Sequence, residues 1–163
     1  MPHKLVVPGG WDGYEECFDP KVGQDRGVHV LNHSEITING YRFFGSPLTS
    51  ASPKWAFYVK PSHFRDFFER IEGPIDVLIT HSCPFPSVHP HEILDTNALF
   101  DHPYDPFLLQ SVQKLAPKHH IFGTFWDHLE DNYPQKIGPT QFHSVGVLDF
   151  AFDFAHFGTV IEL

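Results

Sequence analysis

Residues 35–44, Glu35-Ile-Thr-Ile-Asn-Gly-Tyr-Arg-Phe-Phe44, decide how this chain begins to fold. Two short runs of β-branched and aromatic residues flank the dipeptide Asn39-Gly40. Asn-Gly favours a type I′ turn because both central residues of that turn need a positive φ. The stretch therefore predicts a β-hairpin, with strands at 35–38 and 41–44.

Helix and strand signals alternate after the hairpin. Ser62 is expected to cap a helix that runs to Ile71, because phenylalanines recur between them at helical spacing. The apolar run over residues 75–79 predicts a strand buried on both faces. This part of the chain therefore predicts a helix that packs against a buried strand.

The second half repeats this alternation. Asp105-Pro106 predicts the start of another helix, with Asp as N-cap and Pro at the first helical position, and Pro117 ends it. Residues 119–122 predict a short strand, and residues 157–163 are expected to form the last one. The whole pattern indicates a mixed α/β fold with α+β-type layers.

Composition narrows the class of protein. The chain has 163 residues, of which 41% are hydrophobic, so we expect one globular domain over residues 1–163. The net charge of −9 argues against a nucleic-acid surface, which needs clustered Lys and Arg. No run is long enough for a membrane span and no signal peptide is recognisable, which predicts an intracellular soluble protein, cytoplasmic or in an organelle matrix. Cys17 and Cys83 are interpreted as free thiols.

Five segments occur in an order known from one enzyme family. They are Leu5-Val-Val-Pro-Gly9 before a Gly-Trp-Asp turn, Ile38-Asn-Gly-Tyr-Arg-Phe-Phe-Gly-Ser-Pro47, Trp55-Ala-Phe57, Asp76-Val-Leu-Ile-Thr-His81 and Pro117-Lys-His-His-Ile-Phe-Gly123. Together they resemble the calcineurin-like metallophosphoesterases, especially the small single-domain branch found in animals and bacteria. The resemblance spans most of the chain.

That resemblance implies a β-sandwich of two facing sheets flanked by helices. The family's first two metal motifs would lie before residue 5 and are not found here, so we expect an incomplete version of the sandwich. An incomplete sheet has an open edge, and open edges pair with other chains. The sequence therefore predicts a protein partner or a homo-oligomer formed through an open sheet edge.

The resemblance also places the metal ligands. Gly10 stands where the family has a ligating Asn, and Trp11 where it has the His that contacts the scissile phosphate. Thr124 and Trp126 stand at two His ligand positions, so His81 is the family ligand that is retained. One imidazole cannot hold the pair of cations that activates water in such enzymes. We therefore expect a degenerate, non-catalytic protein that acts as a structural or interaction subunit, with no cofactor.

Two alternatives stay open at this point. His89, His91 and His102 lie in the Pro- and His-rich segment 82–104, which is either a zinc site or a solvated loop. The chain could also be a divergent metal-dependent phosphoesterase that hydrolyses phosphate mono- or diesters with His81 and ligands foreign to the family. Its metal would then be a divalent ion, Mn, Fe or Zn.

Overall fold

The structure is a computed structural model that describes residues 3–10, 12, 27–50, 53–85, 106–123, 135–146, 154, 158 and 160–163. These residues form two helices and eight strands: β1 (Lys4–Val6), β2 (Val28–Val30), β3 (Ser34–Ile38), β4 (Tyr41–Ser46), α1 (Pro61–Glu69), β5 (Val77–Thr80), α2 (Pro106–Leu115), β6 (His119–Phe122), β7 (Lys136–Ile137) and β8 (Thr140–Ser144). The class is therefore mixed α and β, as the sequence predicts.

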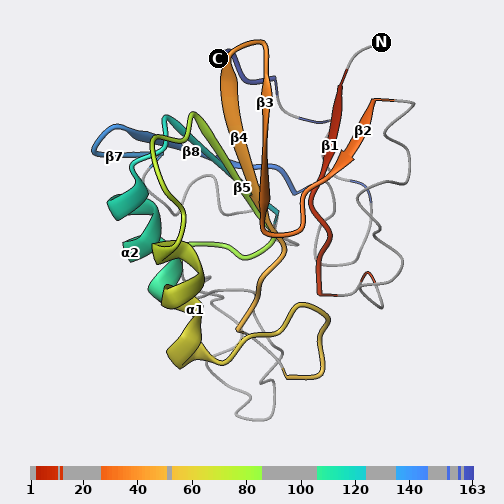
Figure 1. Cartoon of the computed structure of the whole chain (residues 1–163), viewed down its shortest axis with the longest axis vertical. Helices are drawn as coiled ribbons and strands as arrows, with labels where there is room; N and C mark the ends of the chain where they lie inside the picture. Colours follow the sequence, from red (N-terminus) through yellow and green to blue (C-terminus); the bar gives the residue numbers. More distant parts are fainter. Residues whose placement is uncertain are drawn as a thin grey trace.

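Six of the strands make one mixed sheet in the order β3-β4-β5-β6-β8-β7 (Figure 1). Its centre is parallel, because β4, β5, β6 and β8 run in the same direction. An antiparallel hairpin closes each side, β3 with β4 and β7 with β8. The parallel centre brings the carboxyl ends of four strands to one edge of the sheet.

The predicted hairpin is confirmed. Ser34 to Ile38 pairs antiparallel with Tyr41 to Gly45, and Ile38 lies opposite Tyr41. Asn39 and Gly40 have φ angles of 52° and 86°, which are the positive values that a type I′ turn requires. The local sequence alone specifies this unit.

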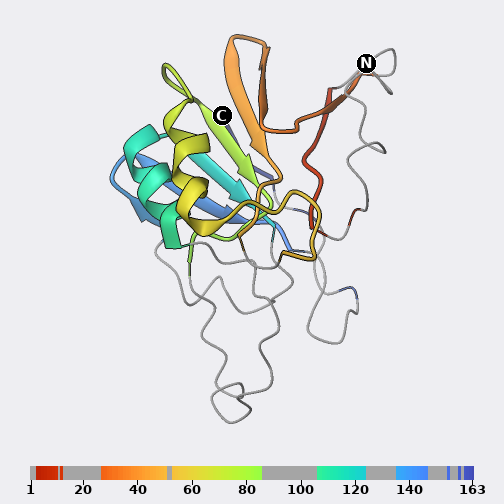
Figure 2. The same ribbon diagram turned by 60° about the horizontal axis from the view of Figure 1, so that its bottom comes forward.

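Both helices cover one face of the large sheet (Figure 2). Alternating strand residues reach toward them, and Phe44, Leu78 and Phe142 enter the core together with Phe64 and Phe68 of α1. Phe64 and Phe68 stack at 5.1 Å between ring centroids. Full burial of a side chain of this size contributes about 1.5–3 kcal/mol, so the phenylalanine stripe on α1 is core packing.

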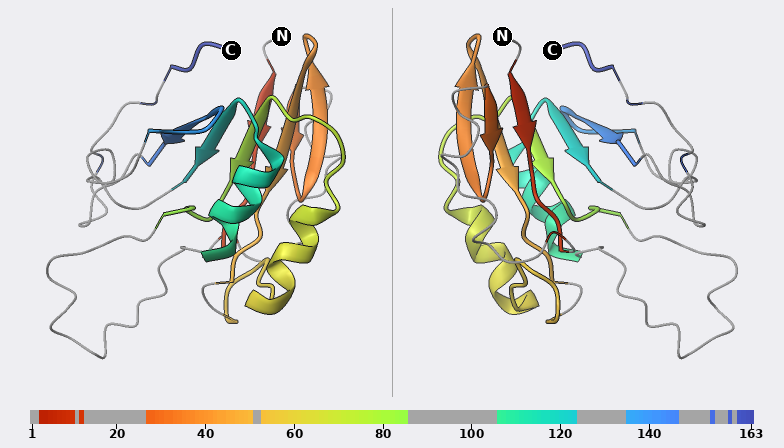
Figure 3. Two further views of the ribbon diagram at one scale, coloured as in Figure 1. Left: turned by 90° about the vertical axis from the view of Figure 1, so that its left-hand side faces the viewer. Right: turned by 90° about the vertical axis from the view of Figure 1, so that its right-hand side faces the viewer.

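The small parallel sheet of β1 and β2 lies on the opposite face (Figure 3). Gly45 in β4 is the contact point, because a Cβ atom there would come within 2.3 Å of the Leu31 Cβ and 2.8 Å of the Val7 Cγ2. Only glycine leaves room for the two sheets to approach so closely.

His33 joins this region to the helical layer. Its Nε2 donates to the Phe67 carbonyl at 3.2 Å, so its Nδ1 accepts from the Ser46 hydroxyl at 3.1 Å. Its ring meets Phe44, Phe67 and Phe68 edge-on. Burial lowers the pKa of His33, which keeps the ring neutral.

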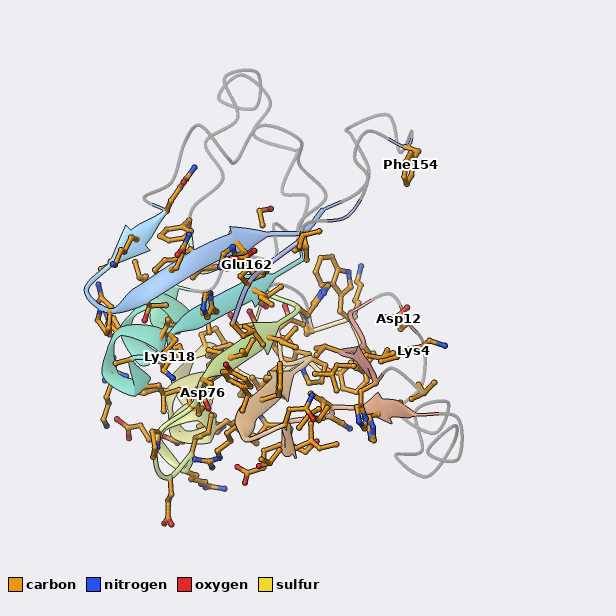
Figure 4. The ribbon with its side chains drawn as sticks, turned by 90° about the horizontal axis from the view of Figure 1, so that it is seen from above. Lys4, Asp12, Asp76, Lys118, Phe154 and Glu162 are labelled. Carbon is orange, nitrogen blue, oxygen red and sulfur yellow. The ribbon has the colours of Figure 1, made fainter. Side chains whose placement is uncertain are left out.

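At the other end of the sheet, where the parallel strands begin, hydrogen bonds and ion pairs hold the chain. The Asp76 carboxylate accepts from the Arg42 backbone N–H at 2.8 Å and pairs with the Lys118 ammonium at 2.7 Å (Figure 4). The Arg42 guanidinium also donates to the Pro74 carbonyl and pairs with Glu35. These contacts tie the first hairpin to the segment that enters β5.

Three sequence predictions need correction. Helix α1 starts at Pro61 rather than behind a Ser62 cap, because proline fits the first helical position. Lys60 is the N-cap residue, and no side-chain capping hydrogen bond is formed there. It ends at Glu69, before Ile71. Of the predicted last strand 157–163, the described residues 158 and 160–163 are not in a strand. In the part of the chain that the structure describes, the last strands are instead β7 and β8, which join at Gly138 in a left-handed conformation, with φ 58°.

The helix after Pro106 and the strand at 119–122 are confirmed. Within the described ranges, no helix combines the length and the apolar character needed to cross a membrane.

Candidate functional site

Four chain segments leave the large sheet at one edge. Ser46, Thr80, Phe122 and Ser144 occupy the same row across β4, β5, β6 and β8. Backbone hydrogen bonds continue past this row, from His81 N–H to the Ser46 carbonyl at 3.0 Å and from Gly123 N–H to the Thr80 carbonyl at 3.2 Å. Ligands of open α/β sheets bind at such carboxyl edges, so this edge is the candidate site.

The loop after β1 reaches the same edge. The Gly9 N–H donates to the Asp12 carboxylate at 2.6 Å, and the Asp12 N–H donates back to the Gly9 carbonyl at 3.1 Å. This reciprocal pair folds the loop into a tight turn. The turn points the Gly10 N–H at His81, whose Nε2 accepts it at 3.1 Å.

Two glycines let this loop pack closely against aromatic rings. A Cβ at Gly9 would lie 2.6 Å from the His81 Nδ1, and one at Gly10 would lie 2.7 Å from the Trp55 ring. Trp55 also meets the His81 ring at 6.4 Å between centroids. The loop, Trp55 and His81 therefore form one packed cluster, in which any side chain on either glycine would displace a ring.

The hydrogen bond from the Gly10 N–H fixes the tautomer of His81. Since Nε2 accepts, the ring proton of the neutral form is on Nδ1. Burial lowers the pKa of His81, although the charge of Asp12 opposes that shift. The ring is thus neutral at pH 7, and the lone pair that a cation would need is already engaged by a backbone N–H.

A buried chain of hydrogen bonds holds the turn that carries His81. The Thr80 hydroxyl donates to the Ser82 carbonyl at 2.8 Å, so it accepts from His120 Nε2, also at 2.8 Å. His120 is fully buried, and burial lowers its pKa to about 3, with the charge of His143 adding to the shift. The turn that carries His81 is therefore held by a neutral imidazole.

Cys83 follows this turn and carries a free thiol. Burial raises the pKa of Cys83 to about 12. A thiol with such a pKa is protonated at pH 7 and is not a nucleophile, so Cys83 belongs to the core.

The structure brings together two of the residues that the sequence singles out, Gly10 and His81. The others, Trp11, Thr124, Trp126, His89, His91 and His102, lie outside the described residues. Within the part of the chain that the structure describes, no group of three or more His, Cys, Asp or Glu side chains is placed to hold a metal ion.

Sequence reasoning missed the roles of Trp55 and His120. Trp55 contacts Gly10 from 45 positions further along the chain, so no local pattern indicates this packing. His120 did leave a signal, because it alternates with Phe122 along β6 and therefore shares the buried face of that strand.

No protein-family model matches this chain.

Proposed function

We propose that this chain has a degenerate metallophosphoesterase fold and acts as a non-catalytic structural or interaction subunit. One observation carries the proposal: the His81 Nε2 accepts a hydrogen bond from the Gly10 N–H. In the resemblance to the calcineurin-like enzymes, these two positions are both metal-ligand positions. Here a hydrogen-bond donor faces the imidazole where a cation would otherwise be bound.

Two features support the family relationship. Gly10 and His81 are 71 residues apart in the sequence, yet they touch at the carboxyl edge, as two ligand positions of a single metal site would. The small sheet also faces the large one at Gly45, in keeping with a sandwich of two sheets with helices outside. Both features fit an incomplete version of that sandwich.

The chemistry follows from the ligands. A dinuclear site activates water and neutralises the charge that develops on the phosphoryl oxygens. Gly10 has no side chain to contribute, and the lone pair of His81 is engaged. Without both cations, neither the nucleophile nor the charge stabilisation of the family mechanism is available.

Metal analysis and a phosphodiesterase assay test the catalytic half of the proposal. Purified protein, incubated with Mn²⁺, Fe²⁺ or Zn²⁺ and then desalted, is expected to retain no pair of metals that depends on His81. It is also expected to hydrolyse bis-nitrophenyl phosphate no faster than its His81→Gln variant. His63→Gln, on the exposed surface of α1, is the matched control. Two bound metals, with turnover that His81→Gln abolishes and His63→Gln retains, would establish the divergent phosphoesterase instead.

The proposed role as an interaction subunit rests on the free side of strand β3. Among the described residues, β3 pairs only with β4, so its other edge has no neighbouring strand. A free strand edge is a template for another chain. In a two-residue hairpin, hydrogen-bonded and non-hydrogen-bonded pairs alternate from the turn, which makes Thr37 opposite Arg42 a non-hydrogen-bonded pair. The Thr37 N–H therefore points to the free edge.

Thr37→Pro is expected to weaken self-association through β3 by at least about tenfold. Proline removes the outward N–H but no bond to β4, and loss of one interface hydrogen bond costs about 1.5 kcal/mol. Sedimentation velocity over a concentration series measures the change, with Thr37→Val as the control that keeps the N–H. Self-association that Thr37→Pro leaves unchanged, or a wild-type chain that stays monomeric and captures no partner strand, would count against β3 as the interface.

A further inference from the structure

His119 and His143 form a pair on the large sheet, outside the site around His81. They lie diagonally across the parallel strands β6 and β8, where His119 is opposite Gln141 and His143 is opposite Ile121. Their neighbours His120 and Phe142 are buried beneath the helices. Side chains alternate along a strand, so His119 and His143 both project from the other face, where each is part-buried.

The two rings meet through nitrogen. The His119 Nδ1 lies 3.0 Å from the His143 Nε2, and the ring planes are 25° from parallel with centroids 5.2 Å apart. One hydrogen lies between these two nitrogens, donated by one ring to the lone pair of the other. Among the described residues, neither ring is paired with a carboxylate. Neutral imidazole is the form in which histidine binds metals.

We propose that His119 and His143 bind a divalent transition-metal ion, of the zinc, copper and nickel class, through Nδ1 and Nε2 respectively. Imidazole nitrogen suits this class of ion. On binding, the hydrogen between the rings moves through solvent to the far nitrogen of its own ring. Both rings stay neutral, and each presents a lone pair to the ion. Water completes the coordination from the solvent side, since both residues are partly exposed.

The geometry needs only a small adjustment. With metal–nitrogen bonds of about 2.0–2.1 Å, two tetrahedral ligands lie about 3.3–3.4 Å apart. The rings must therefore separate by about 0.3–0.4 Å and tilt so that both lone pairs meet at the ion. The hydrogen-bonded ladder between β6 and β8 fixes the two backbones, so the pair is largely arranged before the ion arrives. Gln141, exposed and opposite His119, offers a carboxamide oxygen to the same face.

This site does not depend on the function proposed above. It uses neither His81 nor Gly10, and it has two protein ligands rather than the set that a dinuclear centre needs. A second pair, His3 directly before β1 and His29 in β2, shows the same diagonal arrangement, with the His3 Nδ1 and the His29 Nε2 3.0 Å apart. His3 is exposed, so this pair provides the matched control.

The test uses the full chain, with Zn²⁺ followed by calorimetry and Cu²⁺ followed by two-dimensional NMR of ¹⁵N-labelled protein. Wild-type protein is expected to bind one Zn²⁺ at this site, and Cu²⁺ is expected to broaden the amide signals of Ile121 and Phe142 first. His119→Gln and His143→Gln should each weaken the binding at least about tenfold and remove that broadening, as loss of a ligand demands. The double variant His3→Gln/His29→Gln should retain both.

Several results would overturn the proposal. The first is that the wild-type chain binds no metal. The second is that both single variants still bind it. The third is that only the His3→Gln/His29→Gln variant loses the binding. The NMR spectrum of each variant reports whether it is folded. Because each histidine is tested separately, failure of one variant to fold leaves the other decisive. Turnover of a phosphodiester does not enter this test, so its outcome is independent of the activity assay.

Discussion

Replacing Gly45 by alanine should lower the free energy of unfolding by about 3 kcal/mol, near the upper end of the cost of overpacking a core. The new Cβ would lie 2.3 Å from the Leu31 Cβ, which belongs to the root of a side chain and cannot rotate away. One backbone must therefore move, and the two sheets must separate where they pack most closely. Urea unfolding followed by tryptophan fluorescence measures the loss.

Gly158→Ala is the matched control for this change. It is the same substitution at a described position where an added Cβ meets nothing within 4 Å. Its effect should stay within about 0.5 kcal/mol, as for other surface substitutions away from special features. If Gly45→Ala behaved like Gly158→Ala, the close approach of the two sheets would be wrong.

Acid should begin to destabilise the protein at a pH above the range in which carboxylates titrate. The pKa of His120 is about 3 in the folded protein, against 6.5 when it is free. The unfolded chain therefore binds a proton that the folded chain does not, so stability falls as the pH drops from about 6.5 toward 3. By pH 5 this residue alone costs about 2 kcal/mol, or about 1.4 kcal/mol per pH unit across that range.

Three part-buried histidines act in the same direction. The pKa values of His33, His81 and His143 are also lowered by burial, so each adds to the loss as the pH falls below 6.5. Asp76 affects the free energy of unfolding in a lower pH range. Its hydrogen bond to the Arg42 backbone and its contact with Lys118 lower the pKa of its carboxyl, so its contribution is lost only as the pH falls below about 3.8. Above about pH 4.5 the histidine effect can thus be measured without that of Asp76.

His120→Gln tests the assignment. The glutamine amide reaches the position of Nε2 and can still donate to Thr80, but it does not titrate. The slope of unfolding free energy against pH, measured between pH 6.5 and 4.5, should fall by about 1.4 kcal/mol per pH unit. His63→Gln on the exposed surface of α1 should leave the slope unchanged. An equal slope in wild type and His120→Gln would mean that His120 is protonated in the folded protein.

Local sequence predicts the local parts of this fold and little else. Asn39-Gly40 specifies its own turn, and the apolar run at 75–79 predicts the largely buried strand β5. The start of α1 was misplaced because Ser62 and Pro61 are both N-terminal signals and lie side by side. The final hairpin was missed because Gln141 and His143 interrupt the apolar pattern of β8.

The candidate site depended on contacts that no window of sequence contains. The resemblance named Gly10 and His81 separately, and the fold brings them together across 71 residues. That His81 is engaged by a backbone N–H follows only from the turn set by Asp12 and from the packing of Trp55. The sequence could single out the two positions, but not the hydrogen bond that joins them.

His33 contacts three regions of the fold through its ring and its backbone. Its ring bonds to the end of β4 through Ser46 and to the end of α1 through Phe67, while its own backbone joins the small sheet to β3. Loss of the contacts of this imidazole would therefore loosen all three regions together. The small sheet, the first hairpin and the first helix are therefore expected to open as one cooperative unit in hydrogen exchange rather than as three.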